Sequence, residues 1–218
     1  MKQLILDVRP DFQPSLANFV PGDNAALLAA LQEQCSRDDG SLLYLWGESG
    51  SGRSHLLQAA AASASARPVV YAQPAQGIES PGPRGLLLVD DLARHDEAAL
   101  AELFRLMINA RTMQQSFIIT GDVPPTVLTL RADVASRVAQ GLAFEIRPLS
   151  DAQKKTTLLE HARARGMQLP GELIDYLLRH SRRDLPWLMA VLDALDEASL
   201  SLARPITLPL LREILKTP

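Results

Sequence analysis

The feature that most constrains the fold of this chain is a short apolar run that leads into a glycine-rich loop and then an alanine-rich stretch. Residues 42–46 read LLYLW and residues 47–54 read GESGSGRS. A short apolar run bounded by glycine and serine is typical of a strand buried on both faces. The alanine-rich stretch favours a helix from Ser54 to about Ala66. Strand, glycine-rich loop and helix in this order predict an α/β domain with a phosphate-binding loop.

Other apolar runs extend this unit into a sheet. Further strands are expected at 69–72, 86–89, 117–120 and 142–146. Helices are expected through 25–35, around 131–140, and between the third and fourth strands. The helix between the third and fourth strands has one apolar stripe, formed by Leu100, Leu103, Phe104, Met107 and Ile108. Strands that alternate with helices imply a parallel sheet covered by helices on both faces.

The pattern changes after Pro148, where strand signals stop. Ser150 is a candidate cap for a helix to about Arg165, and Gly166 would end that helix. More helices are expected at 170–180, 184–200 and 208–216. The sequence thus predicts three parts: an extended arm over residues 1–11, an α/β domain over 12–148, and a small all-helical domain over 149–218.

The glycine-rich loop has the residue types that a phosphate chain requires. Its glycines leave backbone N–H groups unhindered, so these groups can converge on phosphate oxygens at the start of the next helix. Ser54 has the position of the hydroxyl that ligates Mg²⁺ in such loops. Arg53 stands where a lysine is usual, and its planar fork is not equivalent to a compact ammonium. The alternative is a turn that binds nothing. The predicted cradle comprises Gly47, Glu48, Ser49, Gly50, Ser51, Gly52, Arg53, Ser54 and His55.

Two aspartates follow the predicted strand at 86–89. A carboxylate at the tip of a buried strand beside a phosphate-binding loop holds Mg²⁺ in such sites. Asp90 is therefore the expected metal ligand together with Ser54, and Asp91 is the candidate to orient an attacking water. The alternative is that these strand-end aspartates cap the next helix.

Two further features are weaker on their own. Asp122 follows the strand at 117–120 and would face a γ-phosphate if that strand lies beside the first one, but GDVPP alone is simply a turn. Arg131 and Arg137 lie on one predicted helix. An arginine that approaches a triphosphate from a neighbouring subunit speeds hydrolysis by about 10³–10⁵. Exposed helical arginines are more often only solvated.

Composition excludes several classes of function. A net charge of −3 over 218 residues provides no global basic field for nucleic acid. Cys35 is the single cysteine, so we expect no disulfide framework, a reducing compartment and an inert thiol. The histidines have no metal-ligand spacing. The N-terminal apolar patch is too short for a signal peptide and no apolar run approaches membrane-spanning length, so a cytoplasmic location without membrane binding is expected.

Several motifs occur together in one order along the chain. They are Phe12-x6-Phe19-x2-Gly22-x-Asn24, GRSH at Gly52–His55, the Asp90–Asp91 pair, and Ala135-Ser136-Arg137. In this order, and over about residues 12–216, the chain resembles the DnaA-type AAA+ ATPases. The resemblance is strongest to the Hda subfamily, whose members inactivate the replication initiator. The shared segments are YLW before the loop, RSHLL, ITGD-PP, VASR and LREILK.

The resemblance implies a three-layer α/β domain with a five-stranded parallel sheet, followed by a helical lid domain. It implies that the two domains bind ADP or ATP with Mg²⁺, and that Pro21 and Asn24 lie near the base. It makes Asp122 a sensor of the γ-phosphate. It makes Arg137 an arginine finger that acts in trans on the nucleotide of a partner.

The arm also gains an interpretation from the resemblance. Gln3-Leu4-x-Leu6 resembles the motif by which Hda proteins bind the DNA polymerase sliding clamp. Such a peptide is extended, with a polar anchor and alternating apolar residues that fill a pocket. Asp7 and Val8 depart from the usual continuation of the motif. A disordered tail or an edge strand is the alternative.

Two departures from the family pattern concern the lid and a loop. Pro186 stands where family members usually have an arginine that reaches the phosphates, and Arg183 is the candidate substitute. The loop at 73–85 is short and has no pattern for the helix that DnaA uses near single-stranded DNA. No helix-turn-helix module is visible in the sequence, so sequence-specific reading of DNA is not expected.

Three functional hypotheses follow. The first is a clamp-tethered, nucleotide-bound regulator that lends Arg137 to DnaA and stimulates hydrolysis of the ATP on DnaA, being itself at most a weak ATPase. The second is an AAA+ ATPase or loader that self-assembles and hydrolyses its own ATP, which Gly47, Asp90 and Asp91 favour. The third is a non-catalytic DNA-binding initiator fragment, against which the acidic charge and the short loop argue. Homo-oligomerisation is left open.

Overall fold

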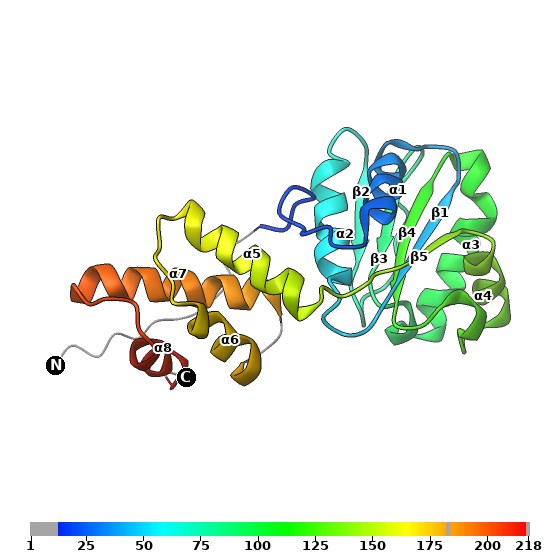
Figure 1. The fold of residues 1–218 in the computed structure, drawn as a ribbon. Coiled ribbons are helices and arrows are strands. Elements are labelled where there is room, and N and C mark those ends of the chain that lie inside the picture. Colours follow the sequence, from blue (N-terminus) through cyan, green and yellow to red (C-terminus); the bar gives the residue numbers. More distant parts are fainter. Residues whose placement is uncertain (1–12, 182–183, 217–218) are drawn as a thin grey trace. The chain divides into compact units, whose positions relative to one another are not determined.

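The computed structural model of the protein describes residues 13–181 and 184–216. It divides into two compact units, one formed by Pro14–Pro148 and the other by the chain from Leu149 onward. The first unit contains every strand of the described chain, and the second is built from helices (Figure 1).

The first unit is a five-stranded parallel sheet with the strand order β2-β3-β4-β1-β5. The strands are β1 (Leu42–Trp46), β2 (Val69–Ala72), β3 (Leu86–Val89), β4 (Ser116–Gly121) and β5 (Leu142–Glu145). Every residue of β3 and β4 is buried, as expected for strands that read as continuous apolar runs. The predicted fold class is confirmed, and so is the expectation that the fourth strand lies beside the first.

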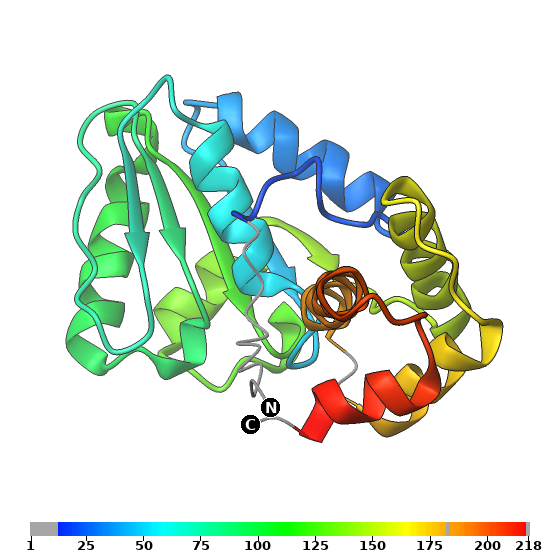
Figure 2. The same cartoon turned by 90° about the vertical axis from the view of Figure 1, so that its left-hand side faces the viewer.

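Helices cover both faces of this sheet and make it a three-layer structure (Figure 2). They are α1 (Ala25–Ser36), α2 (Arg53–Ser63), α3 (Glu97–Met113) and α4 (Ala132–Ala139), with short 3-10 turns η1 (Leu92–Arg94) and η2 (Pro125–Val127). Alternate strand residues enter two separate cores, because side chains alternate across a strand. Leu86 and Leu88 pack with α1 and α2, whereas Leu87 and Val89 pack with α3 and α4.

The apolar stripe predicted for the helix that follows the third strand is wrong at one end. Ile108 is 55% exposed, whereas Leu103, Leu106 and Met107 are buried in the core. The buried stripe of α3 is centred on these residues and on Ala99 and Ala110; Phe104 packs at its margin, and Ile108 lies beyond it in solvent.

The second unit is a bundle of four helices in the described chain. They are α5 (Asp151–Ala164), α6 (Gly171–His180), α7 (Leu185–Leu202) and α8 (Leu208–Lys216). Ser150 and Gln153 form a reciprocal capping box at the start of α5, as the sequence predicts for Ser150. Gly166 adopts φ +73° just after α5, which is the left-handed conformation that favours glycine at a helix end. Leu158, Ile174 and Leu195 are fully buried in the core of this unit.

Candidate nucleotide site

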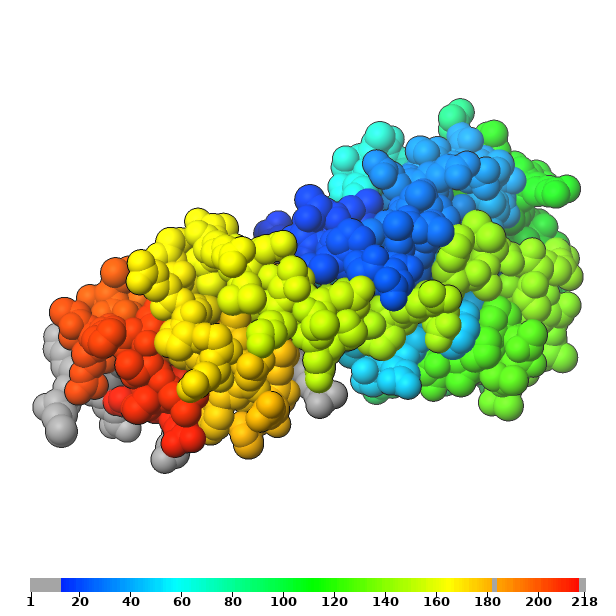
Figure 3. Space-filling model, viewed as in Figure 1, coloured from blue at the N-terminus to red at the C-terminus, as the bar shows by residue number. Residues whose placement is uncertain are grey.

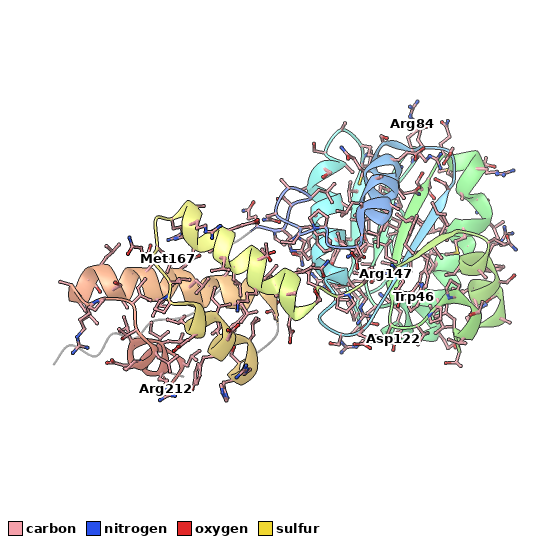
Figure 4. All side chains as sticks on the ribbon, in the orientation of Figure 1. Trp46, Arg84, Asp122, Arg147, Met167 and Arg212 are labelled. Carbon is pink, nitrogen blue, oxygen red and sulfur yellow. The ribbon has the colours of Figure 1, made fainter. Side chains whose placement is uncertain are left out.

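The carboxyl ends of β3, β4 and β1 lie at one edge of the sheet, because these three parallel strands are neighbours. This brings together the glycine-rich loop after β1, the aspartate pair after β3 and Asp122 after β4. The loop is tied directly to β4, since the backbone N–H of Gly47 donates to the carbonyl of Gly121 at 3.2 Å. Asp122, Trp46 and Arg147 lie at this edge in Figure 4, and Arg84 lies at the opposite edge.

Two glycines of the loop are required by its geometry. A Cβ atom on Gly47 would lie 2.8 Å from Ser51 Oγ and 2.9 Å from the carbonyl oxygen of Ile146. Gly52 adopts φ +101° and precedes the first residue of α2. The first turn of α2 therefore presents backbone N–H groups that the helix itself does not use, directly after the loop.

Two buried polar atoms of the loop have no hydrogen-bond partner among the residues that the structure describes. They are Ser51 Oγ and Arg53 Nη1. Arg53 Nη1 lies 3.6 Å from Asp91 Oδ1, which is an ion pair but too long for a hydrogen bond. Buried polar groups are nearly always satisfied in proteins, so two orphaned groups beside a helix N-terminus need an explanation. A bound phosphate would accept from both, and the loop therefore fits that ligand.

The two aspartates after β3 are held by a small network. Asp90 is buried, and its Oδ1 accepts from the hydroxyl of Thr120 at 2.8 Å while its Oδ2 accepts from the hydroxyl of Tyr71 at 2.9 Å. Asp91 adopts φ +50°, and its backbone N–H donates to Thr120 Oγ1 at 2.9 Å. Asp91 stands at the N-cap position of η1, but its side chain makes no capping hydrogen bond there, and α3 is capped by Asp96. The alternative of a simple capping role is therefore not what the structure shows.

The residues present fit Mg²⁺ only if phosphate shares its coordination. Among the described residues no group of three or more His, Cys, Asp or Glu side chains could hold a metal ion by itself. Ser54 is exposed in the first turn of α2, and Asp90 offers a carboxylate at the same edge of the sheet. Mg²⁺ is usually bound in this way, through one or two protein oxygens together with substrate phosphates and waters.

Sequence reasoning missed Thr120, Tyr71 and His95 as parts of this site. His95 is buried, and its Nε2 lies 3.0 Å from the backbone carbonyl of Asp90. Burial, and then the hydrogen bond to Asp90, raise the pKa of Tyr71 above its usual range, so its hydroxyl remains a donor. The only available signal was a polar residue, Thr120, at the end of an otherwise apolar strand.

The turn at residues 21–24 is held by its own backbone contacts. The N–H of Asn24 donates to the carbonyl of Pro21 at 2.8 Å, and Gly22 between them adopts φ +49°. The side chain of Asn24 also bonds both backbone groups of Arg147, donating to the carbonyl at 2.9 Å and accepting from the N–H at 2.8 Å. Asn24 therefore fixes this turn against the end of the first unit, and its amide is already engaged.

The segment before this turn packs on the start of α2. The ring of Phe19 lies 5.7 Å from the ring of His55 between centroids, and a Cβ atom on Gly52 would lie 3.0 Å from Phe19. His55 Nε2 lies 3.3 Å from the carbonyl oxygen of Ser15. The space-filling view shows this N-terminal segment, in dark blue, against the surface of α1 (Figure 3). His55, predicted to bind the nucleotide, here holds the segment against α2.

The two arginines on and before α4 differ in their partners. Arg131 pairs with Asp133 at 2.8 Å and with Glu97 at 3.8 Å. Arg137 is exposed in the last turn of α4, and its side chain has no ion-pair partner within residues 13–181 and 184–216. Of the two arginines, Arg137 is the one left available for an external anion.

Four predicted site residues lie outside the described residues, namely Gln3, Leu4, Leu6 and Arg183. Their proposed roles rest on the sequence alone. Among the described residues, none of the helices combines the length and apolar character that a membrane span requires.

Comparison with known proteins gives a family match within the helical unit and structural matches over most of the chain. A family model described as "Hda, lid domain" matches residues 151–215. Domain III of the Thermotoga maritima replication initiation protein DnaA matches with a TM-score of 0.69 and 18% identity, covering 94% of this chain and 96% of that one. AMPPCP-bound DnaA from Aquifex aeolicus matches with a TM-score of 0.68 and 21% identity, covering 87% and 67%.

A solved DNA replication initiation factor also matches, with a TM-score of 0.66 and 19% identity over 87% of this chain. The chain spans 66% of the length of that structure. At these identities the solved structures show the fold, and the family model identifies the helical unit. The chain therefore has the AAA+ fold of DnaA-like proteins and carries a lid domain of the Hda family.

Proposed function

We propose that this chain is a nucleotide-bound regulator of DNA replication initiation that supplies Arg137 to DnaA and stimulates hydrolysis of the ATP bound there. The proposal rests on a contrast within one site. The phosphate loop has buried donors on Ser51 and Arg53 that lack hydrogen-bond acceptors among the described residues, whereas the carboxylate of Asp91, the candidate to orient water, already pairs with Arg53. The Hda lid match and the DnaA-like fold support the choice of partner.

Nucleotide binding is the first part of the proposal. Within the described part of the chain, Ser51 Oγ and Arg53 Nη1 are buried without hydrogen-bond acceptors, and the first turn of α2 adds backbone donors. ADP or ATP would satisfy these groups through its phosphates. Mg²⁺, held by Ser54 and Asp90, would neutralise phosphate charge. A solved DnaA relative is described as bound to AMPPCP, a nucleotide analogue, which supports this choice of ligand.

Weak turnover of its own nucleotide is the second part. Asp91 is the candidate to orient water, but its carboxylate faces Arg53 at 3.6 Å, and both side chains are largely buried. A carboxylate that already faces a guanidinium is less available to orient a water molecule, because one of its oxygens is directed at another partner. The chain would therefore retain its nucleotide as a bound ligand and hydrolyse it slowly.

Action in trans is the third part. Arg137 is exposed and unpaired in the described chain, whereas Arg131 is held by two carboxylates. An arginine that stabilises the transition state for phosphoryl transfer from a neighbouring subunit contributes about 10³–10⁵ to the rate. Asp122, at the end of β4, would respond to the γ-phosphate in the chain's own site. Attachment to the sliding clamp through Gln3, Leu4 and Leu6 would bring the regulator to DnaA near replicating DNA.

The test is a turnover assay with ATP-charged DnaA, DNA-loaded clamp and this protein, following conversion of ATP to ADP. The proposal predicts stimulation that is abolished by Arg137→Ala and retained by Arg131→Ala, a control at the other end of the same helix. Replacing both Gln3 and Leu4 by alanine should remove the dependence on the clamp. Equal turnover by the protein alone, without DnaA or clamp, would support instead a self-assembling ATPase. Arg137→Ala with full stimulation would contradict the finger.

A further inference from the structure

Thr120 makes hydrogen bonds to both aspartates of the candidate site. It is the fifth residue of β4 and is completely buried. The parallel register pairs Val89 with Ile119, so the next residues along the two strands, Asp90 and Thr120, are also neighbours. The Thr120 hydroxyl donates to Asp90 Oδ1 at 2.8 Å and accepts from the backbone N–H of Asp91 at 2.9 Å. A hydroxyl has one donor and can accept as well, so both of its functions are used.

Each of these bonds fixes a different property of the site. The bond to Asp90 orients a buried carboxylate whose other oxygen is held by Tyr71. The bond from Asp91 N–H holds that residue at φ +50°, a region that residues other than glycine rarely adopt. In this conformation the Asp91 carboxylate faces Arg53 of the phosphate loop. The Thr120 hydroxyl thus fixes both the orientation of Asp90, the candidate metal ligand, and the position of Asp91 in its ion pair with Arg53.

We propose that Thr120 is a positioning residue of the metal–nucleotide site. Its hydroxyl orients Asp90 for Mg²⁺ and, through the backbone of Asp91, sets the position of the carboxylate that pairs with Arg53. This inference rests on the proposed nucleotide binding and adds a residue to it. Replacing a residue that hydrogen-bonds to a metal ligand and orients it typically lowers metal affinity by about 10–100-fold.

The chain offers three closely matched variants. Thr120→Val keeps the shape of the side chain but removes both hydrogen bonds, and Thr120→Ser keeps the hydroxyl. Tyr71→Phe removes the bond to Asp90 Oδ2, together with the interaction of the hydroxyl with Gln58, and leaves the bond between Asp91 N–H and Thr120 in place. If Thr120 contributed only through packing, Thr120→Ser would reduce the Mg²⁺ enhancement of ADP affinity at least as much as Thr120→Val, because serine lacks the methyl group.

The experiment measures the affinity for ADP by titration calorimetry, once with Mg²⁺ and once with EDTA, for the wild-type protein and the three variants. Thr120→Val should lose about tenfold or more of the enhancement that Mg²⁺ gives, while its affinity in EDTA changes less. Thr120→Ser should restore most of the enhancement. Tyr71→Phe should lose part of it. Hydrogen exchange should show a faster Asp91 amide in Thr120→Val but not in Tyr71→Phe.

The two proposals fail in different ways. Wild-type protein that binds ADP in neither buffer overturns the proposed function and this inference with it. Wild-type protein that binds with a clear Mg²⁺ enhancement, which Thr120→Val retains in full, overturns only the role of Thr120. If Thr120→Val does not fold, Thr120→Ala takes its place in the same titration, and an unchanged Mg²⁺ enhancement there has the same meaning.

Discussion

The arginine in the phosphate loop is the residue in which this chain departs most clearly from the usual pattern. Arg53 is largely buried and directed at Asp91, and its Nη1 has no hydrogen-bond partner among residues 13–181 and 184–216. A guanidinium can contact a phosphate oxygen and a carboxylate at once through its fork of donors, which a lysine ammonium cannot do with the same geometry. Arg53 therefore links the phosphate loop to Asp91. When phosphate binds, Arg53 would divide its hydrogen bonds between the phosphate and the Asp91 carboxylate.

Replacing Arg53 tests this arrangement. Arg53→Ala should weaken ADP binding by about 1.5–3 kcal/mol, the usual value of a hydrogen bond to a charged group. Arg53→Lys should recover part of that loss, because the charge returns without the fork. Titration calorimetry measures both, and Arg131→Ala is a control with a paired arginine elsewhere in the unit. Wild-type affinity in Arg53→Ala would exclude Arg53 from the cradle.

Cys35 supplies a second prediction at this scale. Burial raises the pKa of its thiol from 9.0 to about 11. The thiolate is the reactive form, so iodoacetamide should label Cys35 slowly in the folded protein at pH 8 and readily in denaturant. Since the folded pKa is the higher one, the thiol stabilises the fold below about pH 9, and this contribution is lost as the pH rises towards 11. Denaturation midpoints over this range should fall less in Cys35→Ala. Equal labelling rates with and without denaturant would exclude a buried thiol.

At the scale of the elements, the pairing of β1 with β4 determines the site, because it places the phosphate loop beside Thr120 and Asp122. Close packing supports this pairing. Tyr44 on β1 is fully buried, and its hydroxyl donates to the carbonyl of Val123 at 2.9 Å. Burial, and then the nearby charge of Asp122, raise the pKa of Tyr44 above its usual range, so it remains a donor. Gly121 leaves the space that the Tyr44 ring and hydroxyl occupy.

Gly121→Ala tests this packing. The added Cβ would overlap the Tyr44 hydroxyl oxygen and lie 2.9 Å from the ring carbon that carries it, so the buried Tyr44 side chain or the backbone around it must shift. Overpacking of this kind typically lowers the free energy of unfolding by about 1–3 kcal/mol. Gly77→Ala is the matched control, because a Cβ there meets nothing within 4 Å. Chemical denaturation compares the two, and equal midpoints would contradict the close approach.

The elements could be predicted from the sequence with good boundaries, because short apolar runs and turn residues mark them locally. β1, β2 and β3 have the predicted ends, and α5 begins after its predicted cap. The contacts of the site could not be predicted in the same way. The hydroxyl of Thr120 on Asp90, and the amide of Asn24 on Arg147, join residues that are far apart in the chain. Only the sheet order and register bring such pairs together. The exposure of Ile108 was missed for a related reason, since the orientation of α3 is set by its packing.

At the scale of the whole molecule, the two units differ in what supports their identity. The helical unit matches the Hda lid model, and the DnaA structures match the fold of most of the chain, so the sheet unit is related to DnaA through its fold alone. The central claim concerns the sheet unit, namely that the loop Gly47–Ser54 binds a nucleotide. Its structural support is the helix N-terminus, the glycine geometry and the two orphaned polar atoms.

The most direct test of this claim is thermal unfolding of the protein with and without ADP and Mg²⁺. A ligand present at about 100 times its Kd stabilises the folded state by roughly 2.7 kcal/mol, so the unfolding midpoint should rise by several degrees. Arg53→Ala should show a smaller rise at the same nucleotide concentration. An unchanged midpoint of the wild-type protein at millimolar ADP and at millimolar ATP, each with Mg²⁺, would contradict nucleotide binding by this loop.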